Sequence, residues 1–352
     1  MGIIRNQSIK NSISFYIGMT IGAFNTILIY PNVFNNQPQH WGLLSILVAY
    51  ATLIGTFSSL GIPKTFIRFF PAIMEKGQLY FLSLIIPLFG FLLSCLGYWL
   101  FKEELFVLLN ASQLLQDNFF YIFSLVFFIS FYDILTSISR SYLDASTPIF
   151  LNEIVLKSYS LILLVLHGYK LFDFTTFLQL YVCGFLFKFL LLFILQLFKG
   201  NLYIKLSLGA LKIKEIVVYG AYVLIGGASV IFVSRLDLIM IGALLGLEHV
   251  AFYTLAFYIG SVIKVPGKSI ISISVPLLAK AWEEQDFKQI QTIYSKSSIN
   301  QLIIGGLFFL CVWINIDAIF SILPEKFSHG KWVVLCIGLA QLFSAAAGVN
   351  GA

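Results

Sequence analysis

Two lysines, Lys264 and Lys268, stand inside a long apolar stretch, roughly residues 250–279, that otherwise has the composition of a membrane-spanning helix. Being four residues apart, they lie on one face of that helix. Each costs about 2.5–3.5 kcal/mol at the centre of a bilayer. Between them, Pro266 removes a backbone donor and Gly267 loosens the helix, which a membrane tolerates only where protein or water satisfies the freed groups. The pattern indicates the wall of a polar pathway for an anion; the alternative is that both ammonium groups reach the headgroup layer.

Other charged residues also fall within or at the ends of apolar stretches. They are Asp133, Arg140, Glu153, Lys157, Lys188, Arg235 and Asp237. Glu153 precedes Lys157 by four residues, the favourable order for an ion pair within one helix, so we interpret that pair as structural. We expect Arg235 and Asp237 to end a helix near the outer surface.

Asp133 and Arg140 are seven residues apart and share one helix face. They either line a cavity or pair with Lys157 or Lys188. Four lysines are predicted to lie in the central or inner part of their helices: Lys157, Lys188, Lys264 and Lys268. One interpretation is a cationic vestibule suited to a phosphate-bearing substrate. The general bias of positive residues toward the cytoplasm explains part of the same pattern.

Signals of catalysis are absent from the sequence. It contains no phosphate-binding glycine loop, no paired histidines at helical spacing and no cluster with metal-ligand spacing. We therefore expect neither an enzyme nor a metal or other cofactor, and no nucleic-acid partner. The four cysteines lie singly in apolar runs and predict small buried residues without disulfides: Cys95, Cys183, Cys311 and Cys336.

The elements that position these residues are membrane helices. The chain is 59% hydrophobic and 11% charged, with a mean hydropathy of +0.93, whereas soluble domains carry about 25% charged residues. The sequence therefore predicts an all-α polytopic membrane protein surrounded by the lipid bilayer. Hydropathy predicts about ten helices, over residues 11–34, 41–62, 78–101, 118–139, 149–167, 174–198, 216–234 (with 238–247 as an extension), 250–279, 297–316 and 332–352.

Orientation follows from the distribution of lysine and arginine between the loops. With the N-terminus in the cytoplasm, thirteen such residues fall on the inner side: Arg5, Lys10, Lys64, Arg68, Lys76, Arg140, Lys199, Lys205, Lys212, Lys214, Lys280, Lys288 and Lys296. Five fall on the outer side: Lys102, Lys170, Arg235, Lys326 and Lys331. This asymmetry predicts a cytoplasmic N-terminus. An amphipathic charged connector is predicted over 280–296.

An internal repeat relates the two parts of the chain. The residues 39–42 and 248–251 each follow a long apolar helix and open another, and each second helix then meets a cluster of Gly, Pro, Lys and Ser, at 58–64 and 264–269. The offset is about 205–209 residues, or six helices. Because six is even, both parts have the same orientation. Interrupted helices at matching positions of two halves are typical of a transport site.

Four segments resemble a known family: 5–12 (RNQSIKNS), 60–71 (LGIPKTFIRFFP), 234–246 (SRLDLIMIGALLG) and 330–351, which begins GKW and ends GVNG. The chain resembles polysaccharide-biosynthesis flippases of the multidrug/oligosaccharidyl-lipid/polysaccharide (MOP, MATE-like) exporter superfamily, and the resemblance covers essentially its whole length.

That resemblance implies two six-helix lobes in parallel repeat, here residues 1–200 with helices 1–6 and residues 201–352 with helices 7–10. Since the family has twelve to fourteen helices and the chain stops inside an apolar run, we expect an incomplete second lobe. It also implies alternating access that flips an undecaprenyl-pyrophosphate-linked oligosaccharide outward across the cell (inner) membrane, by a protein that we expect to be a monomer. The cavity residues carried over are Arg68, Lys264 and Lys268, followed by Lys188 and Arg140, with Asp133 as an ion or charge partner.

Two alternative functions stay open. A cation-coupled multidrug exporter of the same fold favours an acidic cavity, for which Asp133 is the plausible buried acid. A membrane-embedded glycosyltransferase or polymerase needs a catalytic loop with acidic residues, and the loops predicted at 102–117, 280–296 and 317–331 are short.

Overall fold

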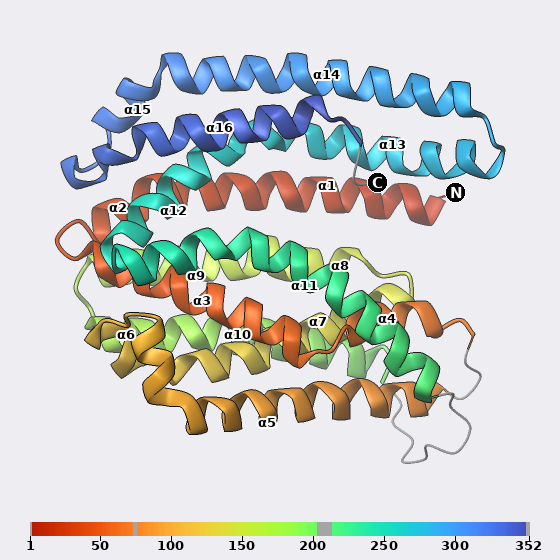
Figure 1. Cartoon of the computed structure of the whole chain (residues 1–352), viewed down its shortest axis with the longest axis horizontal. Coiled ribbons are helices and arrows are strands. Elements are labelled where there is room, and N and C mark those ends of the chain that lie inside the picture. The colour runs from red at the N-terminus through yellow and green to blue at the C-terminus, as the bar shows by residue number, and fades with distance from the viewer. Residues whose placement is uncertain (1, 73–75, 203–212, 350–352) are drawn as a thin grey trace. The chain divides into compact units, whose positions relative to one another are not determined.

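The computed structural model describes residues 2–72, 76–202 and 213–349 (Figure 1). Within them every regular element is helical, and eight helices are long and apolar enough to cross a membrane. The predicted all-α polytopic fold class is therefore confirmed. The elements are α1 (Gly2–Ala23), η1 (Phe24–Ile29), α2 (Tyr30–Val33), α3 (Pro38–Ser58), α4 (Ile62–Phe69), α5 (Lys76–Leu108), α6 (Gln113–Asn118), α7 (Tyr121–Ser141), α8 (Ser146–Phe150), η2 (Leu151–Val155), α9 (Leu156–Gly168), α10 (Phe174–Phe198), α11 (Ile213–Leu244), α12 (Leu247–Ser261), η3 (Val262–Lys264), α13 (Val265–Glu283), α14 (Phe287–Ile314), α15 (Ile316–Ser321), η4 (Glu325–Gly330) and α16 (Lys331–Ala346).

The chain forms two compact units. Unit 1 comprises residues 1–25 and 36–251, and unit 2 comprises residues 26–35 and 252–352. The boundaries fall inside η1, between α2 and α3, and inside α12. The predicted lobes, 1–200 and 201–352, stay a prediction.

The core of unit 1 is centred on α3 and α7. These two helices pack against each other, α3 also packs on α5 and α11, and α7 also packs on α4 and α10. Their facing side chains are fully buried, among them Leu43 and Ala49 of α3 and Leu125 and Val126 of α7. In a membrane, helices gain no hydrophobic driving force from one another, so such close packing supplies the attraction.

A glycine sets the closest approach to α3. A Cβ built on Gly42 would lie 1.8 Å from the carbonyl oxygen of Leu247, so that no side chain fits between the two backbones. Small residues at helix contacts are typical of membrane proteins for this reason.

Two short π-helical turns, η1 and η2, interrupt the first and fifth predicted helices. A π-turn places one extra residue in the helix and is frequent at functional positions. In unit 1, η2 packs against α1, where a Cβ built on Gly18 would lie 2.6 Å from the carbonyl oxygen of Glu153. Gly18 therefore lets the polar turn Leu151–Val155 touch the backbone of α1.

Unit 2 is built on α14. This helix packs against α13 and α16, which both run beneath it in Figure 1, and η3 packs against α14 and α16. Asp286 caps α14 by accepting a hydrogen bond from the backbone N–H of Gln289 at 2.9 Å. The amphipathic connector predicted over 280–296 consists of the end of α13 and the start of α14.

Two sequence-based expectations are wrong. Arg235 and Asp237 do not end a helix, because α11 continues through them to Leu244. Their opposite charges interact, which reduces the cost of having both inside one helix. The extension predicted over 238–247 is thereby confirmed to Leu244. The cysteines are not uniformly buried either: Cys183, Cys311 and Cys336 are exposed and Cys95 is half-buried. In a bilayer an exposed helix face is apolar, so a cysteine fits there as well as in a core.

Candidate functional site

Lys188 lies in the interior of unit 1, with 4% of its surface exposed. Its Nζ donates to Oδ1 of Asn152 at 2.9 Å and lies 4.2 Å from the ring centroid of Tyr132 and 5.2 Å from that of Phe185. A buried ammonium group needs such partners, because it loses its hydration shell on burial. The amide oxygen and the two aromatic faces replace that shell.

A chain of hydrogen bonds continues from Asn152 across three helices. Asn152 Nδ2 donates to Oε1 of Glu153 at 3.2 Å, and Glu153 accepts from Lys157 Nζ at 2.7 Å. Lys157 also donates to the carbonyl oxygen of Gly18 at 3.0 Å. The predicted structural pair of Glu153 and Lys157 is therefore confirmed, and it sits on η2 and the first turn of α9.

Asn25 completes this inner polar network, which we define as Gly18, Asn25, Tyr132, Asn152, Glu153, Lys157 and Lys188. Asn25 is buried, and its Nδ2 donates to the carbonyl oxygen of Lys157 at 3.0 Å. The network joins α1, η1, α7, η2, α9 and α10 through polar contacts inside an apolar bundle. Interhelical hydrogen bonds of this kind fix the positions of membrane helices.

Asp133 and Arg140 lie beside this network on α7. Both are exposed, and the charge of Asp133 interacts with those of Lys188 and Arg140. With Lys157 and Glu153 included, three positive and two negative side chains gather here, which gives a formal net charge of +1. The sequence left open whether Asp133 and Arg140 line a cavity or pair with Lys157 or Lys188. In the structure Asp133 lies near Lys188.

Arg68 is exposed in the last turn of α4. The interruption between α3 and α4 is real: α3 ends at Ser58, and Gly61 has a φ of 72° before α4 begins. A Cβ on Gly61 would lie 2.3 Å from the carbonyl oxygen of Gly220 on α11, so glycine is required here for both its backbone angle and its contact.

The break predicted at the lysines of unit 2 is confirmed. The predicted eighth helix consists of α12, the 3₁₀ turn η3 and α13, with Lys264 as the last residue of the turn. Lys264 is exposed, and the side chain of Lys268 lies outside the described residues. Lys264 also lines a cavity of about 30 Å³ within unit 2, together with the polar side chains of Gln301, Gln341 and Ser344.

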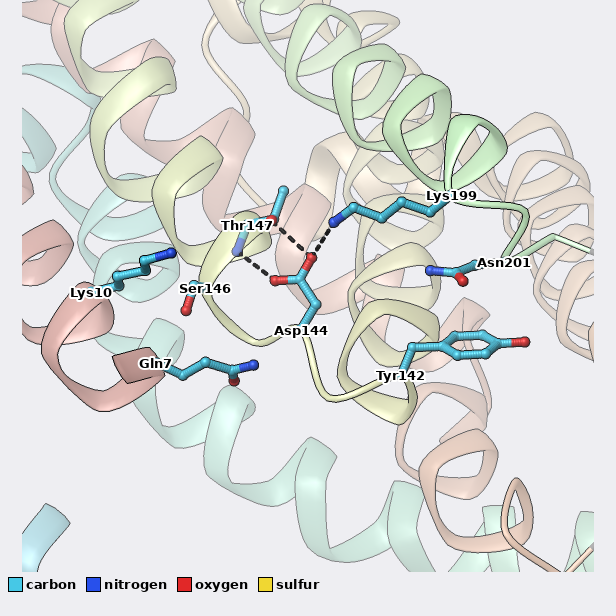
Figure 2. Close-up of a pocket in the computed structure, with 8 residues that line it drawn as sticks. All are labelled: Gln7, Lys10, Tyr142, Asp144, Ser146, Thr147, Lys199 and Asn201. Carbon is cyan, nitrogen blue, oxygen red and sulfur yellow. Dashed lines mark hydrogen bonds and ion pairs between the residues drawn. The ribbon is translucent and has the colours of Figure 1, made fainter. Parts of the chain in front are cut away.

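A larger cavity, of about 650 Å³, lies in unit 1. Figure 2 shows eight residues that line it, from α1, the turn before α8 and the end of α10 among others. Lys199, at the end of α10, donates to Oδ2 of Asp144 at 2.6 Å, and Asp144 also accepts from the backbone N–H of Thr147 at 3.1 Å. Burial alone would raise the pKa of the Asp144 carboxyl, but these hydrogen bonds and the Lys199 charge hold that pKa below its ordinary value. Lys10, from α1, lies on the other side of the Asp144–Thr147 turn from Lys199 (Figure 2). The ion pair fastens α10 to the turn before α8, so we assign it a structural role.

Sequence reasoning missed the neutral members of these sites, Tyr132, Asn152 and Gln301. The signal available was an amide inside an apolar run, which is weaker than a charge because an amide also fits at a helix surface. The structure brings Lys188, Asp133 and Arg140 together in unit 1 and places Lys264 beside Gln301 in unit 2. Among the described residues, no group of three or more His, Cys, Asp or Glu side chains is placed to hold a metal ion.

Solved structures similar to this chain include several MATE proteins. A multidrug resistance MATE family transporter of the MOP superfamily in an inward-facing conformation aligns with a TM-score of 0.70 at 15% identity, over 98% of this chain and 84% of that one. A MATE transporter in complex with MaD3S aligns at 0.59 with 15% identity, and one in a bent conformation at 0.56 with 16% identity; each alignment covers 98% of this chain and 83% of the other. At this identity the likeness establishes the fold.

Sequence comparison establishes the family. No curated protein sequence matches the chain. The family model described as "Polysaccharide biosynthesis protein" matches residues 8–282, which is most of the chain and includes both interrupted helices. The chain therefore belongs to the polysaccharide biosynthesis protein family and has a MATE-like fold.

Proposed function

We propose that this protein exports a lipid-linked oligosaccharide, carried on undecaprenyl pyrophosphate, across the cell (inner) membrane by alternating access. The observation that carries the proposal is the family match over residues 8–282. The fold supports a membrane exporter, and the cationic side chains in apolar helices supply partners for an anionic group. The product would serve surface polysaccharides such as lipopolysaccharide O-antigen, and the Lys/Arg bias supports a cytoplasmic N-terminus.

The cargo has two chemically different parts, and each suits a different environment. Its prenyl tail is apolar and stays in the bilayer, whereas its pyrophosphate and sugars need polar partners during passage. Lys264 and Lys268 are the proposed pyrophosphate ligands, with Arg68, Arg140 and Lys188 as further candidates. Lys188 is buried and already bound to Asn152, so in this structure it is better placed to position neighbours than to meet a substrate.

The test is the double variant Lys264→Gln/Lys268→Gln in proteoliposomes loaded with the labelled lipid-linked oligosaccharide. A hydrogen bond to a charged group contributes about 1.5–3 kcal/mol, so losing two reduces the affinity for the cargo by about a hundredfold or more. The matched control is Lys288→Gln/Lys296→Gln, which removes two exposed lysines from α14. Equal translocation by the double variant, the control and the unchanged protein refutes the proposed role of the two lysines.

A second candidate function, cation-coupled export of organic cations, is favoured by one observation. Asp133 is an exposed acid on α7 within a membrane-spanning helix. If the cargo is an organic cation, its binding depends on that carboxylate, and Asp133→Asn abolishes it. The measurement is the binding of a fluorescent organic cation. If the cation does not bind, or if it binds equally well to Asp133→Asn, the lipid-linked cargo is the better proposal.

A further inference from the structure

A small polar cavity lies within unit 2, where the 3₁₀ turn η3 meets α14 and the end of α16. Its volume is about 30 Å³, and its polar lining consists of Lys264, Gln301, Gln341 and Ser344. Two glycines, Gly267 and Gly348, also line it, and Gly348 has a φ of 67°, a conformation that favours glycine. The cavity accommodates about one heavy atom.

Gln301 is the unusual residue of this cavity. Only 4% of its surface is exposed, and its Nε2 has no hydrogen-bond partner among the described residues. Buried amide groups in proteins almost always have a partner, because an unpaired N–H forfeits the hydrogen bonds it makes in water. A glutamine held in an apolar bundle with a free donor beside an open cavity therefore points to a ligand that supplies an acceptor.

The orientation of the amide follows from its contact with Gly267. A Cβ built on Gly267 would lie 3.0 Å from Oε1 of Gln301, so of the two polar amide atoms the oxygen lies nearer to the Cα–H groups of this glycine. Such a contact suits a carbonyl oxygen and not an N–H group. Nε2 is consequently the atom that lacks a partner, and it is a donor.

The charge of the lining selects the class of ligand. Lys264, an exposed residue, contributes a positive charge, and no carboxylate is present among the described residues that line the cavity. A donor amide beside an ammonium group attracts a negatively charged acceptor, and a cation would be repelled. Phosphate oxygens are single acceptor atoms that carry negative charge, so they match the cavity in size, polarity and charge.

We propose that Gln301 and Lys264 bind one oxygen of a phosphate or pyrophosphate group, and that this is the subsite for the charged end of the cargo in unit 2. This inference rests on the proposed function and adds Gln301, a residue outside the predicted cationic set. Gln341 and Ser344 stand on the α16 side and complete the polar wall. The 3₁₀ turn ends at Lys264 and packs on α14 and α16, so Lys264 and Gln301 border the same cavity.

The experiment measures binding of undecaprenyl pyrophosphate to the purified full chain in lipid nanodiscs, with undecaprenol as the lipid that lacks phosphate. Inorganic pyrophosphate, the third probe, separates a lipid headgroup from a free anion. Gln301→Leu removes the donor and keeps an apolar side chain of similar length, and Gln301→Glu puts a negative charge in its place. Gln289→Leu, an exposed glutamine on the same helix, is the matched control.

We expect Gln301→Leu to weaken undecaprenyl pyrophosphate binding about tenfold or more, Gln301→Glu to weaken it further, and Gln289→Leu to leave it unchanged. Without ligand, Gln301→Leu should unfold at the same temperature as the unchanged protein or a higher one, because an unpaired buried amide is lost. The rise in unfolding temperature that the ligand produces should shrink in both Gln301 variants. A residue with a purely structural role would instead lower the unfolding temperature without ligand.

The remaining outcomes separate this inference from the proposed function. Binding of undecaprenyl pyrophosphate that is strong and unaffected by either Gln301 variant overturns the inference alone and means that the cavity holds water. A third outcome is that inorganic pyrophosphate binds in a way that depends on Gln301, while undecaprenol and undecaprenyl pyrophosphate bind equally. This outcome supports the site and contradicts the lipid-linked cargo. Absence of binding by all phosphate-bearing probes overturns both.

Discussion

The hydrogen bond between Lys188 and Asn152 offers the sharpest test of the inner polar network. Asn152→Leu replaces the amide by an apolar side chain of similar size and removes the hydrogen-bond acceptor of Lys188, which is 4% exposed. The rings of Tyr132 and Phe185 and the charge of Asp133 remain near the ammonium group. A hydrogen bond to a charged group contributes about 1.5–3 kcal/mol, and breaking a buried charged contact on one side costs about 3–5 kcal/mol. We therefore expect Asn152→Leu to lower the free energy of unfolding by about 3 kcal/mol.

The double-mutant cycle isolates this contact. Lys188→Met removes the charge but leaves Oδ1 of Asn152 without its partner, which costs about 1–3 kcal/mol. In the double variant Asn152→Leu/Lys188→Met, neither group is left buried and unpaired. Its destabilisation should therefore be smaller than the sum of the two single effects by at least about 1.5 kcal/mol.

The assay is reversible unfolding in mixed micelles, followed by intrinsic fluorescence, for the unchanged protein, the two single variants and the double variant. The 3.2 Å bond from Asn152 to Glu153 is lost in both variants that carry Leu at 152, so it cancels from the coupling energy. Single effects that simply add would show that the 2.9 Å contact contributes nothing, and our account of how Lys188 is held would be refuted.

Two further predictions concern unit 1. Because the pKa of Asp144 is below its ordinary value in the folded protein, its contribution to stability is present above the ordinary pKa of about 3.9 and is lost as the pH falls through the folded pKa. Asp144→Asn should accordingly destabilise the protein at pH 7 by about 0.2–1 kcal/mol, as expected for a partly exposed ion pair. This difference in unfolding free energy should vanish in acid, and a difference that persists in acid contradicts the assignment. Gly42→Ala should destabilise the protein by about 1–3 kcal/mol or more, because the new Cβ would lie 1.8 Å from the carbonyl oxygen of Leu247. The control in the same unfolding assay is Gly97→Ala, where the added Cβ meets nothing within 4 Å.

The sequence determined the features that depend on local pattern. Apolar runs of membrane-spanning length fixed the class of protein, and the apolar run interrupted by Lys264 and Pro266 predicted a break that the structure confirms as η3. Glu153 and Lys157 were recognisable as a pair because helix geometry alone brings residues four apart together. The family resemblance was also readable, because it rests on short segments of residues.

Tertiary structure decided everything that depends on how each helix is rotated about its own axis. A helix in a bilayer is apolar on all sides, so hydropathy does not reveal which face meets another helix. For that reason the sequence did not show that Lys188 is buried against Asn152, that Cys183 is exposed, or that Gln301 reaches the turn at Lys264. Those contacts join residues far apart in the chain, and only the packing of the helices brings them together.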